Sequence, residues 1–137
     1  MTAPVDATRI HVLLIESDGL VRSTVASVCR ELDIVRMHQA TNLAMGEQWL
    51  QTSKADGLML SLADPDAALG LLGRLRGGDF RCEASIPVAV MAPSCDAAML
   101  KRLKELDVRR FLLQPFKLRD VIQTVEQLWP AEEKVDA

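Results

Sequence analysis

Cysteine is scarce in this chain of 137 residues, and its three cysteines, Cys29, Cys82 and Cys95, form no CxxC pair. This pattern argues against a disulfide framework and against a zinc site. Long apolar runs are also missing, because the longest ones, at 12–15 and 86–93, are far shorter than the roughly 20 residues that cross a bilayer. The first ten residues lack the basic start and the apolar stretch of a secretory signal. We therefore expect a cytoplasmic protein without a membrane span.

An excess of positive charge is absent as well. The chain has 16 Lys and Arg against 19 Asp and Glu, a formal net charge of −3, which argues against general affinity for nucleic acids. With 49% hydrophobic and 26% charged residues, the composition is typical of globular proteins and not of disordered ones. The length suits one domain with a sizeable core. We expect this domain at residues 9–129, with short tails at 1–8 and 130–137.

Short apolar runs followed by polar turns alternate with segments of helical periodicity. The expected strands are Ile10–Ile15, Val35–Ala40, Gly57–Leu62, Ile86–Met91 and Val108–Leu113. Between them, apolar residues recur at three- and four-residue spacing, as one buried face of a helix requires. The expected helices begin at Leu20, where the first runs to near Asp33, and at about 43, 67, 99 and 121.

The strand runs are continuously apolar, which indicates strands that are buried on both faces of a parallel sheet. The predicted fold class is therefore α/β, a doubly wound five-stranded parallel sheet flanked by five helices. In such sheets ligands bind beyond the carboxyl ends of the strands. The residues just after the strands are accordingly the ones to inspect for function.

Four segments at these strand ends resemble the receiver domain of bacterial two-component response regulators, and the resemblance covers nearly the whole chain. The segments are LLIESD (13–18), ADGLMLSLADPD (55–66), IPVAVMAPS (86–94) and FLLQPF (111–116). Positions 16, 61, 92 and 114 are separated by 45, 31 and 22 residues. This order and spacing is typical of the family's acidic pair, phospho-accepting Asp, Thr or Ser, and Lys before a cis proline. The resemblance implies a flavodoxin-like fold and a role in phosphorelay signal transduction.

The reactive groups of that family are replaced in this sequence. The acidic pair reads Glu16-Ser17, the phospho-acceptor position is Ser61, the hydroxyl position is Ala92, and the lysine position is Gln114. Glu16 alone is a poor ligand set for Mg²⁺, which takes several oxygen ligands in octahedral geometry. We therefore interpret the chain as a pseudo-receiver, which is not an enzyme, binds no metal or other cofactor, and acts in signalling through protein contacts.

Alternatives remain open at the same loops. Asp64 or Asp66 is a candidate substitute acceptor, although Asp-Pro-Asp also suits a turn that leads into a helix. Ser61 or Cys95 is a candidate nucleophile of a small enzyme, but no histidine base lies on the strand-end loops. A further alternative is modification of Ser61 by an external kinase.

The ring-bearing residues are interpreted mainly as packing residues. His11 and His38 fall within expected strands and are read as packed or edge residues rather than metal ligands. Trp49 and Trp129 stand at helical spacing among apolar neighbours, which favours core packing. Phe111 matches the position of an aromatic that swings between two rotamers in receivers. Because no hydroxyl is available here to engage it, we expect Phe111 to stay inward.

Basic residues gather between positions 101 and 119, where seven Lys and Arg stand against two acidic residues. This stretch therefore carries +5 and leaves −8 for the rest of the chain. In receivers the corresponding stretch forms the face that dimerises or docks onto targets. We expect an interaction face here, for an acidic signalling partner or for a second copy of the chain. The expected contact residues are Lys101, Lys104, Arg109, Arg110 and Arg119. The chain has no recognition-helix module, so contact with DNA is not favoured.

Overall fold

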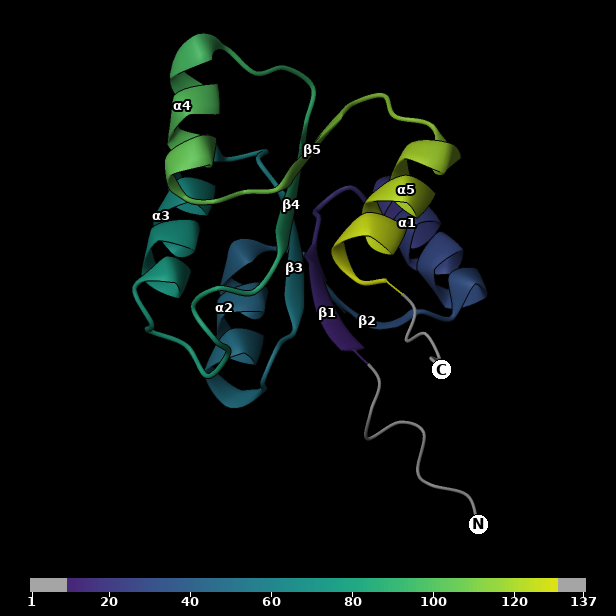
Figure 1. Ribbon diagram of the computed structural model, residues 1–137, viewed down its shortest axis with the longest axis horizontal. Helices are drawn as coiled ribbons and strands as arrows, with labels where there is room; N and C mark the ends of the chain where they lie inside the picture. Colours follow the sequence, from purple (N-terminus) through teal and green to yellow (C-terminus); the bar gives the residue numbers. More distant parts are fainter. Residues whose placement is uncertain (1–9, 131–137) are drawn as a thin grey trace.

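The computed structural model describes residues 10–130, which form five strands and five helices in strict alternation (Figure 1). The strands are β1 (Ile10–Ile15), β2 (Val35–Ala40), β3 (Gly57–Ser61), β4 (Val88–Ala92) and β5 (Arg110–Leu113). The helices are α1 (Gly19–Leu32), α2 (Leu43–Thr52), α3 (Pro65–Arg76), α4 (Ala97–Glu105) and α5 (Leu118–Leu128). The predicted α/β class is confirmed.

The strands form one parallel sheet in the order β2-β1-β3-β4-β5. The chain therefore winds from β1 outward to β2, and then returns to place β3 on the other side of β1. This reversal is the topological switch point, and the carboxyl ends of β1 and β3 lie side by side there.

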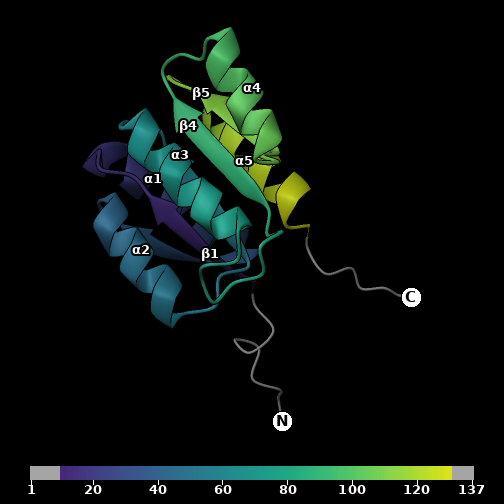
Figure 2. The ribbon, with the colours of Figure 1, turned by 90° about the vertical axis from the view of Figure 1, so that its left-hand side faces the viewer.

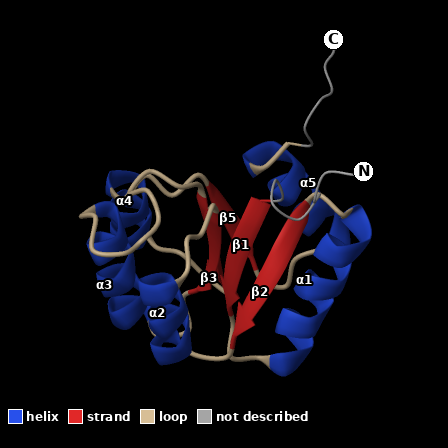
Figure 3. Cartoon of the chain, turned by 90° about the horizontal axis from the view of Figure 1, so that it is seen from below, coloured by secondary structure: helices blue, strands red, loops and turns tan. Residues whose placement is uncertain are grey.

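Helices cover both faces of the sheet. α2, α3 and α4 lie on one face and α1 and α5 on the other, as the view from below shows (Figure 3). On the first face, α2 and α3 lie side by side (Figure 2). Successive strand residues point to opposite faces, so Leu13 belongs to the larger apolar cluster under α2–α4, and Leu14 to the smaller one under α1 and α5. This double burial explains why the strands read as continuous apolar runs.

Trp129 closes one end of the sheet, at the start of β3. Its side chain is 3% exposed, and its Nε1 donates a hydrogen bond to the Asp56 carbonyl at 3.2 Å. The ring lies directly over Gly57, where an added Cβ would come within 2.2 Å of it. Core packing of Trp129 is thus confirmed, and glycine is needed at position 57 because the ring occupies the space of a side chain.

Strand ends differ from the sequence prediction by one or two residues. β4 begins at Val88 rather than Ile86, because the intervening Pro87 has no N–H for the ladder. β5 begins at Arg110 rather than Val108, since the Val108 amide still donates to the Leu103 carbonyl of α4, at 2.9 Å. β3 ends at Ser61 rather than Leu62.

Leu20 and Leu100 stand at the helical spacing that predicts a buried face, and the structure corrects this prediction. Leu20 is 78% exposed in the first turn of α1, and Leu100 is 45% exposed in the first turn of α4. Both residues have the right spacing for their helix's apolar face. The adjacent residues Val21 and Met99, in the same first turns, pack against the two apolar clusters instead.

No helix among residues 10–130 is long and apolar enough to cross a membrane. Of the tails expected at 1–8 and 130–137, only Pro130 lies within the described residues, where it is exposed just after α5.

Candidate functional site

The carboxyl ends of the strands bring together most of the positions that the resemblance to receiver domains singled out. Parallel pairing sets Ile15 opposite Leu60, so that Glu16 follows β1 next to Ser61 at the end of β3. On the far side, the Gln114 amide donates to the Ala92 carbonyl at 2.8 Å. Ser61 lies 45 positions after Glu16 and 53 before Gln114 in the sequence, and all three thus meet at one edge of the sheet.

A cavity of about 660 Å³ opens at this edge, between the start of α1 and the loop after β5. Four of the five substituted positions line it. Its lining residues are Glu16, Ser17, Asp18, Leu20, Val21, Thr24, Ser61, Ala63, Pro93, Gln114, Pro115 and Phe116. Ala92 instead faces a neighbouring cavity of about 370 Å³, which Cys95 and Met99 also line. Position 92 therefore faces the second cavity, which shares Ala63 and Pro93 with the first.

Glu16 is the only charged residue in the buried core of the described chain, with 3% of its surface exposed. Its Oε2 accepts a hydrogen bond from the Asp18 amide at 3.0 Å, and its carbonyl accepts one from Arg22 Nη1 at 2.8 Å. Its Oε1 is buried and has no hydrogen-bond partner among the described residues. Buried polar atoms are normally paired, so this oxygen marks an incomplete arrangement.

These residues do not fit the Mg²⁺ ion that the family resemblance implies. Glu16 and Asp18 are the carboxylates of this cavity, but one Glu16 oxygen accepts from the Asp18 amide, and Asp18 Oδ1 accepts from the first amides of α1. Ser17 and Ser61 stand where the family places further carboxylates, and Mg²⁺ needs several hard oxygen ligands at once. No group of three or more His, Cys, Asp or Glu side chains in residues 10–130 is close enough to hold a metal.

Ser61 and Gln114 are held by local contacts. Ser61 is partly buried, and its Oγ accepts a hydrogen bond from the Ala63 amide at 3.2 Å. Neither histidine lines the cavity, so Ser61 has no imidazole base beside it. Gln114 precedes Pro115 through a cis peptide bond and brings an uncharged amide to the cavity wall.

The remaining carboxylates of these loops belong to residues at the starts of helices. Asp18 is the N-cap of α1, where its Oδ1 accepts from the Leu20 and Val21 amides at 2.9 and 3.1 Å. Asp64 is the N-cap of α3, and Asp66 is exposed in the first turn of that helix. Carboxylates are favoured at helix N-termini, which accounts for these positions without a reaction.

The two histidines meet far from the cavity. His11 Nδ1 and His38 Nε2 are 2.9 Å apart, and the rings stack on β1 and β2. The Trp49 ring of α2 lies against His38, with 4.7 Å between ring centroids. Burial, followed by the charges of His11 and Arg36, lowers the pKa of His38 from its ordinary value. Both histidines are therefore packed near the β2 edge, as the sequence predicted, but their pairing had no sequence signal.

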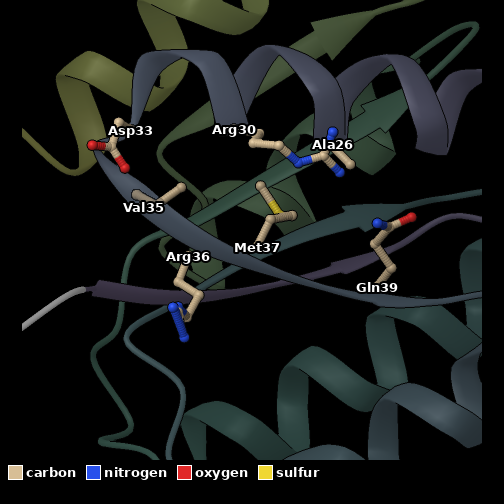
Figure 4. A pocket seen from close by; sticks show the side chains of 7 residues that line it. All are labelled: Ala26, Arg30, Asp33, Val35, Arg36, Met37 and Gln39. Atoms are coloured by element: carbon tan, nitrogen blue, oxygen red, sulfur yellow. The ribbon is translucent and has the colours of Figure 1, made fainter. Parts of the chain in front are cut away.

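A second cavity, of about 320 Å³, lies between α1 and the edge strand β2 (Figure 4). Arg30 and Asp33 reach it from the α1 side, while Met37 points from β2 toward the helix. None of the substituted family positions lines it. It lies along the edge of the sheet rather than at the strand ends, where ligands of this fold class bind.

The expected interaction face combines exposed charge with exposed leucines. Lys101, Lys104, Arg109 and Arg119 are exposed, and none of them forms an ion pair with another described residue. Arg110 is half-buried and donates a hydrogen bond to the Gln127 side chain. Leu100, Leu113 and Leu118 are 45%, 56% and 53% exposed on the same elements. The sequence prediction named only the charged residues of this face, because apolar residues at helix and strand spacing were assigned to the core.

Phe111 is half-buried in β5 and packs against the apolar cluster under α2–α4. Its ring therefore contacts the interior here. Whether it stays there in other states of the protein remains a prediction.

The whole chain was also compared with known proteins. No family model and no curated protein sequence matches it. Solved structures do match: a response regulator from Thermotoga maritima is 19% identical with a TM-score of 0.77, over 90% of this chain and 99% of that one. The HemR receiver domain from Leptospira biflexa is 21% identical with a TM-score of 0.77, over 93% of this chain and 100% of that one. A response regulator receiver protein from Pseudomonas putida is 19% identical with a TM-score of 0.76, over 88% of this chain and 98% of that one. The chain has the fold of response-regulator receiver domains.

Proposed function

We propose that this protein is a pseudo-receiver, a two-component signalling domain that acts in the cytoplasm by protein contacts and without phosphorylation. The observation that carries the proposal is the strand-end cavity, where Ser61 and Gln114 stand at the acceptor and lysine positions. Phosphoryl transfer depends on positioned charge around the moving group. Here Ser61 Oγ is engaged by the Ala63 amide, and Gln114 brings no positive charge.

The output of the domain is docking through α4, β5 and α5. The exposed cations of this face attract an acidic partner over several ångströms, and the exposed leucines supply the apolar contact that makes a complex stable. In receiver domains the corresponding stretch forms the face that dimerises or docks onto targets. In this protein the face is constitutively available for docking, or its availability is controlled by the bound partner.

Loss of phosphorylation is tested by incubating the full chain with acetyl phosphate and Mg²⁺, and separately with beryllofluoride and Mg²⁺. Intact mass spectrometry should detect no phosphoryl adduct, whereas a receiver domain with a complete acidic site, treated in parallel, should acquire one. Tryptophan fluorescence should not respond to beryllofluoride. An adduct that maps to Ser61, Asp64 or Asp66 would show that the domain uses a substitute acceptor.

Docking is tested by charge reversal on α4. The Lys101→Glu/Lys104→Glu variant should lose binding to an acidic partner that the wild-type chain retains at low salt and releases as salt is raised. The matched control is Lys54→Glu/Arg81→Glu, which makes the same charge change at exposed positions in the loops after α2 and α3. Sedimentation of the purified variants distinguishes a foreign partner from self-association. Equal binding by both variants would mean that the basic face is only solvated.

A further inference from the structure

The largest of the cavities described above has largely apolar walls, and Glu16 belongs to its lining. Leu20 and Val21 of α1 form one wall, and Pro115 and Phe116 of the loop after β5 form the other. Its volume of about 660 Å³ lies within the range of cavities that bind small molecules. Leu20 stands at the mouth with 78% of its surface exposed, which makes it a candidate contact for an apolar ligand.

Glu16 offers an acceptor that the protein itself leaves unused. The residue is 97% buried, as its 3% exposure shows, and Oε1 has no partner among the described residues. Its other oxygen and its carbonyl are both engaged, by the Asp18 amide and by Arg22. A buried acceptor without a donor is destabilising, so a ligand that donates a hydrogen bond to Oε1 removes a defect of the free protein.

The charged residues that line the cavity determine which sign of ligand charge it favours. Two carboxylates, those of Glu16 and Asp18, belong to the lining, which includes no Lys, Arg or His. The Arg22 guanidinium donates to the Glu16 carbonyl and does not line the cavity, so the two carboxylates of the lining favour a cation over a phosphate or other anion. A hard metal ion is equally mismatched, because the Asp18 carboxylate caps α1 and the other polar side chains of the lining, such as Ser61 and Gln114, are uncharged.

We propose that this cavity binds a small organic cation, in which an ammonium or amidinium group donates to Glu16 Oε1 and an apolar body lies between Leu20 and Phe116. A protonated amine supplies both the charge and the donor that Oε1 lacks. The proposed ligand is thus opposite in charge to a phosphoryl group. The inference does not depend on the docking proposal, because binding is measured on the isolated chain.

The test is a titration of the ¹⁵N-labelled full chain with benzamidine, followed by amide chemical shifts. Saturable shifts are expected at Glu16, Asp18 and Phe116 up to about 10 mM ligand, the affinity range of a fragment of this size. Benzamide, the neutral isostere, should bind at least tenfold more weakly. Leu20→Ala should weaken binding about threefold to tenfold, since it removes an exposed wall of the cavity and leaves the core intact.

Glu16→Gln should reduce benzamidine affinity at least tenfold, whereas the matched control Glu31→Gln, on the exposed surface of α1, should bind as the wild type does. A thermal melt of each variant checks that it is folded. Absence of saturable shifts, equal binding of benzamide, or shifts of the same amides by Mg²⁺ but not by benzamidine would each overturn the proposal.

Discussion

Replacing Arg76 with alanine is expected to lower the free energy of unfolding by about 3 kcal/mol. The guanidinium of Arg76, at the end of α3, donates to four backbone carbonyls from two loops. Nη1 donates to the carbonyls of Ala84 and Ile86, in the loop before β4, at 2.7 and 2.8 Å. Nε and Nη2 donate to those of Leu106 and Asp107, in the turn after α4, at 2.8 and 3.1 Å. Through these hydrogen bonds, one side chain links α3 to the loop before β4 and to the turn after α4.

The size of this change in unfolding free energy follows from the hydrogen bond that each carbonyl loses. A hydrogen bond to a charged donor contributes roughly 1.5–3 kcal/mol when measured alone, but four bonds to one side chain are not additive. The Asp107 carbonyl belongs to an exposed residue and regains water when Arg76 is removed. The other three carbonyls belong to buried or half-buried residues, and a loss of about 1 kcal/mol at each gives the total of about 3 kcal/mol.

Urea unfolding followed by tryptophan fluorescence measures the effect. With a denaturant dependence of about 2 kcal/mol per molar, the midpoint should fall by about 1.5 M. Arg76→Lys should fall between alanine and the wild type, because an ammonium cannot reproduce the forked donors of a guanidinium. The matched control is Arg74→Ala on the same helix, which removes an exposed ion pair with Glu47 at 2.8 Å.

The control distinguishes the loss of the four carbonyl contacts of Arg76 from a general effect of removing an arginine. Exposed ion pairs contribute little to stability, so the midpoint of Arg74→Ala should move much less than that of Arg76→Ala. Equal shifts in the two variants would refute the reasoning, because they would show that the four carbonyl contacts of Arg76 add nothing beyond the loss of a surface charge.

Three further predictions concern buried or half-buried groups. Gly57→Ala places a Cβ within 2.2 Å of the Trp129 ring and should cost about 2 kcal/mol of unfolding free energy in urea, whereas Gly73→Ala, with nothing within 4 Å, should cost none. Burial lowers the pKa of His38, so the unfolded chain takes up its proton more readily than the folded one. Unfolding free energy should consequently decline as pH falls below about 6.5, and His38→Gln should flatten that decline in urea midpoints measured across this range. Burial also raises the pKa of the Cys29 thiol to about 12, so Cys29 should resist a disulfide reagent at mildly alkaline pH until the protein is unfolded, as mapped by mass spectrometry.

Part of the candidate site was predictable because sequence order and parallel topology are linked. Once five apolar runs indicate a doubly wound sheet, residues that follow the runs must share one edge, and Glu16, Ser61 and Gln114 do so. The division of that edge into two cavities was not predictable. Ala92 lies in the second cavity because its side chain points to the face of the sheet that α2–α4 cover, where it belongs to the larger apolar cluster.

Sequence alone determined the elements of this protein and their order, since helix periodicity, strand burial and caps such as Asp18 act within a few residues along the chain. It also placed Ser61, Ala92 and Gln114 at positions where the resemblance to receiver domains implies reactive groups. Only the tertiary structure decided that Leu20 is exposed, that His11 meets His38, and that Oε1 of Glu16 has no partner. These outcomes depend on the register of strands and on the packing of helices far apart in sequence, and no local pattern encodes the distance between two such atoms.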